Sequence, residues 1–91
     1  MRKRIEVKIY GIVQGVGFRF YAQFRALELG IKGYVKNNFD GSVTFVGEGN
    51  EEDLKKMVEY LKKGPTGAVV QKIDIDWKEA KDEFKDFRIR L

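Results

Sequence analysis

One stretch of the chain, GIVQGVGFRF at residues 11–20, has residue types and spacing that suit a phosphate-sized anion. Three of its first seven residues are glycine, which lets the backbone turn tightly and bring its N–H groups close to a bound group. The expected helix after the turn has no Ser, Thr, Asp or Asn at its start, so its first amides lack a side-chain cap. These amides, together with the cation of Arg19, predict an anion site.

The absence of histidine and cysteine limits the chemistry of such a site. Phosphohistidine and phosphocysteine intermediates, Ser-His-Asp triads and thiol nucleophiles are excluded, as are zinc sites built on His or Cys. Asp74 and Asp76 share one face of an expected strand, but Lys72 and Lys78 flank them. We therefore interpret this group as solvated sheet surface and not as a metal site.

Length and composition predict one packed domain over residues 1–91, because 43% of the residues are hydrophobic. No apolar run approaches the roughly 20 residues that span a bilayer, and the N-terminus lacks the apolar block of a signal peptide. A chain without cysteine is expected in a reducing cytoplasm. The 35% charged content is typical of heat-stable proteins.

The net charge of +4 indicates which partners to expect. A solvated surface of mixed sign accounts for most of it, so we expect no nucleic acid and no membrane partner. The remaining excess of positive charge favours anionic small molecules as ligands. We expect a monomer that acts on a small substrate.

The first half of the chain predicts a strand, a helix and a hairpin. Residues 4–10 alternate strictly, as in a half-buried strand. Spacings of four and three between large apolar residues predict a helix that ends near Gly30. Its predicted buried stripe consists of Phe20, Phe24 and Leu27 with Ala22, Ala26 and Leu29. Residues 31–37 predict a second strand, residues 38–41 (NFDG) a hairpin turn, and residues 42–47 the returning strand.

The second half predicts a helix and two further strands. Asn50 and an acidic first turn indicate a helix start, and a glycine and a proline at residues 64–65 end this helix. Its apolar face consists of Leu54, Met57, Val58 and Leu61. Alternation then predicts a strand over residues 69–78, with Trp77 in the core, and a short final strand over residues 87–91.

The element order is β-α-β-β-α-β plus a short C-terminal strand, which predicts an α+β, ferredoxin-like split βαβ sandwich. We expect an antiparallel sheet with both helices on one face. In this plan the first and second strands run parallel to each other with the third between them. The glycine turn and Asn37 then lie at the same sheet edge, two strand spacings or about 10 Å apart. A tetrahedral anion and a water molecule could fill that gap.

Two motifs, in this order, resemble those of the acylphosphatases. Residues 9–19 (IYGIVQGVGFR) resemble the phosphate-loop motif of that family. Residues 33–37 (GYVKN), followed by residues 41–43 (GSV) and Gly49, resemble its second motif, with Tyr34 where Trp is common. Residues 64–69 and 87–89 resemble later segments, so the resemblance covers essentially the whole chain.

The resemblance implies hydrolysis of acyl phosphates to a carboxylate and inorganic phosphate, which would be both product and inhibitor, without metal or cofactor. By analogy, Arg19 binds the phosphoryl oxygens and Asn37 positions the attacking water. The analogy also assigns phosphate binding to the backbone N–H groups of five residues, Gln14, Gly15, Val16, Gly17 and Phe18. The residue types suit this reaction, because a carboxylate leaves without a protein acid and phosphoryl transfer depends mainly on positioning and charge neutralisation.

Two alternatives remain open. An RNA-binding module could use the same fold, since residues 15–20 (GVGFRF) echo the Gly-Phe-Gly-Phe signature of RNA-recognition domains. That signature, however, lies on the third strand, whereas this one precedes the first helix and the third strand offers only Thr44 and Val46. The other alternative is an acyl- or carbamoyl-phosphate-processing module of a larger assembly, although no residue pattern indicates a docking surface for one.

Overall fold

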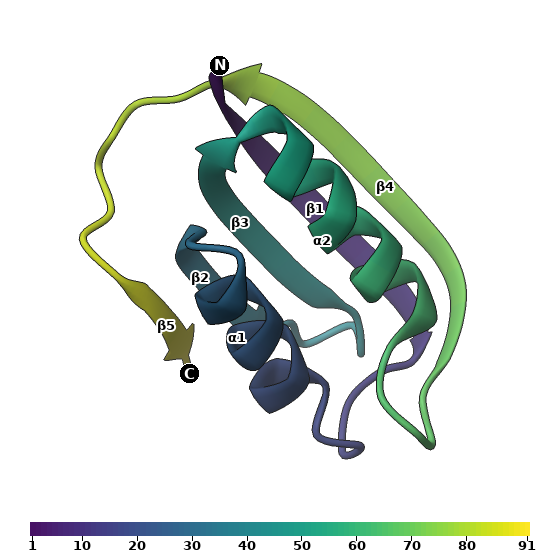
Figure 1. The fold of residues 1–91 in the computed structure, drawn as a ribbon. Helices are drawn as coiled ribbons and strands as arrows, with labels where there is room; N and C mark the ends of the chain where they lie inside the picture. Colours follow the sequence, from purple (N-terminus) through teal and green to yellow (C-terminus); the bar gives the residue numbers. More distant parts are fainter.

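The computed structural model describes residues 1–91 and confirms the predicted order of elements. The elements are β1 (Arg2–Ile12), α1 (Phe18–Glu28), β2 (Lys32–Asn37), β3 (Val43–Asn50), α2 (Glu51–Lys63), β4 (Val69–Glu79) and β5 (Phe87–Arg90). They form one five-stranded sheet in the order β4-β1-β3-β2-β5, and both helices cover the same face of it (Figure 1).

The sheet is mixed rather than wholly antiparallel. β1 pairs antiparallel with β3 and with β4, and β2 pairs antiparallel with β3, as expected. β5, however, pairs parallel with β2, so that Val35 lies opposite Ile89. The reason is the connection over residues 80–86, which crosses one edge of the sheet from the end of β4 to the start of β5 (Figure 1). β5 therefore runs opposite to β4 and in the direction of β1 and β2.

The core lies between the two helices and one face of the sheet. Strict alternation along β1 buries Ile5, Val7 and Ile9, as predicted. Every fourth or third residue of α2 faces them, and all four predicted positions are buried: Leu54, Met57, Val58 and Leu61. The two helices are 11 and 13 residues long, and neither is long and apolar enough to cross a membrane.

The predicted buried stripe of α1 was right for Ala22 and Ala26, which are fully buried, but wrong for its large side chains. Phe20, Phe24 and Leu27 are 71%, 59% and 58% exposed. The residue that joins the two alanines on the face toward the sheet is Phe18. The two alanines are small enough for the helix to lie directly against the sheet, and Phe18 fills the space at its first turn. The larger apolar stripe is therefore left on the outer face of α1.

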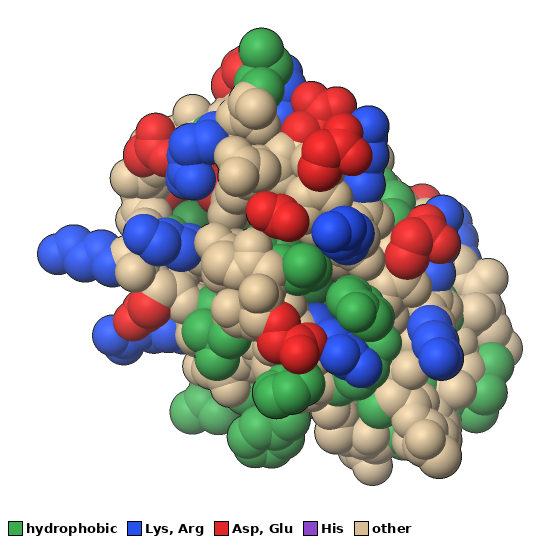
Figure 2. Space-filling view, in the orientation of Figure 1, with side chains coloured by type: hydrophobic (Ala, Val, Ile, Leu, Met, Phe, Trp, Pro, Cys, Tyr) green, Lys and Arg blue, Asp and Glu red, His purple; other side chains and the backbone are tan.

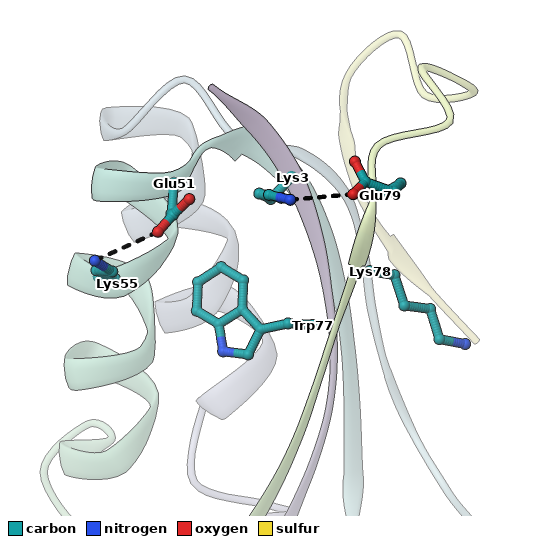
Figure 3. A pocket seen from close by; sticks show the side chains of 6 residues that line it. All are labelled: Lys3, Glu51, Lys55, Trp77, Lys78 and Glu79. Atoms are coloured by element: carbon teal, nitrogen blue, oxygen red, sulfur yellow. Dashed lines mark hydrogen bonds and ion pairs between the residues drawn. The ribbon is translucent and has the colours of Figure 1, made fainter.

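The expected core position of Trp77 was also wrong, since this residue is 42% exposed. Its ring projects from the edge strand β4 toward α2, into a hollow of about 760 Å³ (Figure 3). Charged side chains on the rim of this hollow pair with one another: Lys3 with Glu79 at 3.1 Å and Lys55 with Glu51 at 3.5 Å. Because these charges are already neutralised, the hollow has no free cation for an anion.

Candidate active site

The loop after β1 and the turn after β2 emerge at the same edge of the sheet (Figure 1). Between them lies a small pocket of about 110 Å³. It is lined by Val13, Gly15, Gly17, Phe18, Arg19, Phe20 and Asn37. The structure thus brings Arg19 and Asn37, which are 18 positions apart in the sequence, to one pocket. Of the five loop residues considered for phosphate, Gln14 and Val16 do not line it.

The backbone of the loop presents unpaired N–H groups. Gly15 and Gly17 adopt left-handed conformations, with φ of 76° and 77°, which favour glycine. Gly17 is the N-cap of α1 and supplies no side-chain cap, and the first turn of this helix contains no acidic residue. None of the turn and loop backbone hydrogen bonds is donated by residues 14–18. The loop is therefore a concave set of free donors at a helix N-terminus, the arrangement that binds anions.

Arg19 is a cation without a carboxylate partner. Four other arginines form ion pairs, namely Arg2, Arg4, Arg25 and Arg88. Arg19 forms no ion pair and no side-chain hydrogen bond, although it is partly buried at the first turn of α1. Its planar fork of donors is free to bind two oxygens of a phosphoryl group.

Asn37 ends β2 on the helix-covered face of the sheet, the face on which Val35 is fully buried. Its side-chain oxygen, Oδ1, is buried and accepts no hydrogen bond from the protein. Such an atom is rare in a folded protein and requires an explanation. Because Asn37 also lines the pocket beside Arg19, its side-chain amide is suited to hold a water molecule next to a bound anion.

The Gln14 side chain ties the loop to the hairpin that follows Asn37. Its Nε2 donates hydrogen bonds to the carbonyl oxygens of Asn38 and Ser42, at 2.7 and 2.9 Å. The sequence analysis considered only the backbone N–H of Gln14 and missed this link. A side-chain amide has two donors, but nothing in a single sequence indicates which carbonyls they reach.

The hairpin itself is rigidly hydrogen-bonded. Asn38 Nδ2 donates to the hydroxyls of Ser42 and Thr44, at 2.9 and 2.8 Å. The carboxylate of Asp40 accepts the Ser42 N–H at 2.9 Å and pairs with Lys8 at 3.0 Å. Hydrogen bonds from the Ser42 side chain and backbone, then from Lys8, lower the pKa of Asp40 to about 2. The segment next to Asn37 is therefore held in one conformation.

The pocket is chemically an anion site. It combines free N–H groups, one guanidinium and one amide, and it contains no carboxylate. No group of three or more Asp or Glu side chains in the structure is placed to hold a metal ion.

β3 has no aromatic side chain on the helix-free face of the sheet, where RNA-recognition domains present one, because its single aromatic residue, Phe45, is buried in the core. Residues 15–20 lie in the loop and at the start of α1, not on the third strand. β3 contributes Thr44 and Val46 to the helix-free face of the sheet. Tyr34, on neighbouring β2, is stacked by the guanidinium of Arg90, whose carbon lies 3.8 Å from the ring centre. Arg90 therefore covers one face of this ring.

Comparisons with known proteins point to one family. The family described as Acylphosphatase matches residues 5–89. The acylphosphatase of Caldanaerobacter subterraneus subsp. tengcongensis is 44% identical over 89 residues, which is 98% of this chain and 99% of that one. The crystal structure of acylphosphatase from Bacillus subtilis superposes with a TM-score of 0.95 at 32% identity, covering 98% and 99% of the two chains.

A longer protein also contains this fold. Full-length HypF, in its phosphate- and nucleotide-bound form, superposes with a TM-score of 0.91 at 34% identity. The match covers 100% of this chain but 12% of that one. From the family match and the relatives of equal length, this chain belongs to the acylphosphatase family, the hydrolases that cleave acyl phosphates.

Proposed function

We propose that residues 1–91 act as one domain that hydrolyses acyl phosphates by direct attack of water, without a metal ion. The observation that carries this proposal is that two residues line the same pocket: Arg19, an unpaired cation, and Asn37, whose side-chain oxygen has no hydrogen-bond partner in the protein. In the reaction, the water oxygen bonds to phosphorus and the bond from phosphorus to the acyl oxygen breaks. The carboxylate leaves with the electron pair of that bond.

The phosphoryl group lies in the loop, where the N–H groups of residues 14–18 donate to its oxygens. The Arg19 fork neutralises the negative charge that spreads over those oxygens in the transition state. The same donors bind inorganic phosphate after the carboxylate has left, so phosphate acts as a competitive inhibitor.

Asn37 orients the attacking water. Its side-chain amide forms a hydrogen bond with that water, which leaves an oxygen lone pair directed at phosphorus. An amide is too weak a base to remove the proton, so the proton passes to an oxygen of the substrate. No protein acid is needed, because the leaving carboxylate is stable without protonation.

Release of phosphate from acetyl phosphate, with EDTA present, tests this function in the wild type and in Arg19→Ala. We expect wild-type turnover to survive the chelator and the variant to lose a factor of about 10²–10³ or more, with weaker phosphate inhibition. Arg19→Lys stays low because it lacks the bidentate fork.

A matched control is Arg88→Ala, since Arg88 is exposed on β5 and pairs with Asp86 away from the pocket. This variant keeps wild-type turnover. Loss of activity in EDTA, or an Arg19→Ala variant as active as Arg88→Ala, contradicts the proposal.

The likeness to a segment of full-length HypF favours a second candidate, the same activity as a module within a larger assembly. Turnover by the isolated chain, combined with its mass from size-exclusion chromatography with light scattering, separates the two. A monomer with full activity supports the independent enzyme. The cytoplasmic location stays a prediction.

A further inference from the structure

The place of the Arg19 side chain depends on the first turn of α1. Arg19 forms no ion pair and no side-chain hydrogen bond, so no polar contact of its own holds it. Toward the sheet, α1 presents Ala22 and Ala26, whose short side chains interlock little with the strands. Its outer face is uncovered, and Figure 2 shows hydrophobic side chains exposed there. The contacts that hold this turn must therefore lie at the two sides of the helix.

Two side-chain hydrogen bonds connect α1 to other elements. The hydroxyl of Tyr21 donates to the carbonyl oxygen of Tyr60, in the last turn of α2, at 2.9 Å. The Nε2 atom of Gln23 donates to the carbonyl oxygen of Phe87, in β5, at 3.2 Å. The bond from Tyr21 is the shorter of the two, and Tyr21 lies in the same helical turn as Arg19, two positions after it.

The C-terminal end of α2 also touches the first residue of α1. The two helix ends lie near each other on one face of the sheet (Figure 1). A Cβ atom on Gly64, which has a φ of 69°, would lie 3.0 Å from Cε2 of Phe18 and press on its ring. The Gly64 N–H donates to the same Tyr60 carbonyl oxygen at 2.9 Å, and the rings of Phe18 and Tyr21 pack with their centres 6.1 Å apart. The end of α2 therefore contacts α1 on both sides of Arg19.

Building on the proposed function, we infer that Tyr21 is a positioning residue, whose hydroxyl holds the first turn of α1 against the end of α2 and so keeps the Arg19 guanidinium in place for the phosphoryl group. Tyr21 does not line the pocket, so it acts on the substrate only through Arg19. Its ring also contacts Tyr60 edge-on, with the centres 6.5 Å apart. Ring contacts of this kind are less directional than a hydrogen bond, so the hydroxyl fixes the turn.

Tyr21→Phe tests this inference, because it removes the hydroxyl and keeps both ring contacts. We expect kcat/KM for acetyl phosphate to fall about fivefold, and the dissociation constant of inorganic phosphate to rise by a similar factor, as for the loss of one hydrogen bond. Steady-state kinetics and calorimetric titration with phosphate measure the two quantities, at a temperature well below the unfolding midpoint of each variant.

The same substitution in the Arg19→Ala background separates positioning from a general loss of structure. If Tyr21 acts through Arg19, removing its hydroxyl has no further effect on kcat/KM or on phosphate binding once the guanidinium is gone. A general loosening of the pocket lowers both by the same factor in the two backgrounds. Equal factors in the two backgrounds therefore overturn the inference.

Arg25→Lys is the matched control. Arg25 ties α1 to the same residue of α2, since its guanidinium carbon lies 4.3 Å from the ring centre of Tyr60, but it lies in the last turn of α1. The variant keeps the charge and loses the planar stacking, and we expect wild-type kcat/KM and phosphate binding.

Unchanged kcat/KM and phosphate binding in Tyr21→Phe, or equal losses in Arg25→Lys, contradict the positioning role of Tyr21. Failure of the wild type to hydrolyse acetyl phosphate refutes the proposed function instead. The phosphate titration needs no turnover, so it still decides whether Tyr21 acts through Arg19.

Discussion

Two regions at opposite edges of the sheet hold buried polar groups, and they differ in whether those groups have partners. Glu48, near the end of β3, is 1% exposed, and its carboxylate accepts hydrogen bonds from the N–H groups of Lys81 and Asp82, each at 2.8 Å, and from Arg4 at 3.1 Å. At the pocket, the N–H groups of residues 14–18 and the oxygen of Asn37 have no such partners. Completed hydrogen bonding holds the fold, whereas incomplete hydrogen bonding leaves room for a ligand.

The two arginines of these regions show the same contrast. Arg4 pairs with three carboxylates, those of Glu6, Glu48 and Glu83. Burial acts to lower the pKa of Arg4, but the hydrogen bonds that Arg4 donates to these three side chains outweigh it and raise the pKa above its usual value. Arg19 has no carboxylate partner. The charge of Arg4 is therefore used within the fold, and that of Arg19 is available to a substrate.

Asn37→Ala should produce the largest effect of the three variants considered next. A small effect would show that the unpartnered groups of the pocket are not needed for catalysis. We expect turnover to fall by about 10²–10³, the loss that follows removal of one preorganised polar group. Phosphate inhibition stays close to that of the wild type, because Arg19 and the loop amides remain. Steady-state kinetics with added phosphate measures both quantities. A variant with near-normal turnover excludes the water-positioning role.

Glu48→Gln should affect stability but not catalysis. We expect a loss of about 3 kcal/mol in the free energy of unfolding, at the low end for a disrupted buried ion pair, because Arg4 keeps Glu6 and Glu83. Urea denaturation measures the loss, and kcat of the folded fraction should be unchanged. The control is Glu79→Gln, which disrupts the exposed pair with Lys3 and should cost less than about 1 kcal/mol. Equal losses in the free energy of unfolding of the two variants would show that the burial of Glu48 does not contribute to stability.

Gln14→Met tests the link between the two halves of the pocket, with a smaller expected effect. The variant keeps the length of the side chain but loses both hydrogen bonds to the hairpin. At about 1 kcal/mol for each bond, kcat should fall by up to about thirtyfold, while phosphate inhibition changes less because the loop amides remain. A fall in thermal stability with no change in kcat would indicate that the link serves only the fold.

The position of the site could be predicted because it follows from strand direction and element order. The glycine spacing placed a turn after β1, and the order of strands placed Asn37 at the same edge. The link through Gln14 could not be predicted, since its acceptors are backbone carbonyls. Every residue has a backbone carbonyl, so the sequence does not indicate which of them a side chain reaches.

The face of α1 was predicted only in part, because the helix has apolar residues on two faces. The sequence analysis combined Phe20 and Phe24 with Ala22 and Ala26, but the two pairs have the same spacing on different faces, and only the alanines face the sheet. The phase of the helix depends on how the loop enters it, through the left-handed Gly17. Trp77 was misplaced for a related reason, since alternation shows which face of β4 it occupies but not how far α2 extends over an edge strand.

The parallel pairing of β5 with β2 has a practical consequence for handling the protein. It brings the C-terminus to the edge that carries the candidate site, where Leu91 and Asn37 line one hollow. The N-terminus begins at the far edge (Figure 1). An affinity tag or surface linkage attached after Leu91 would stand beside that hollow, whereas one attached before Met1 lies away from it.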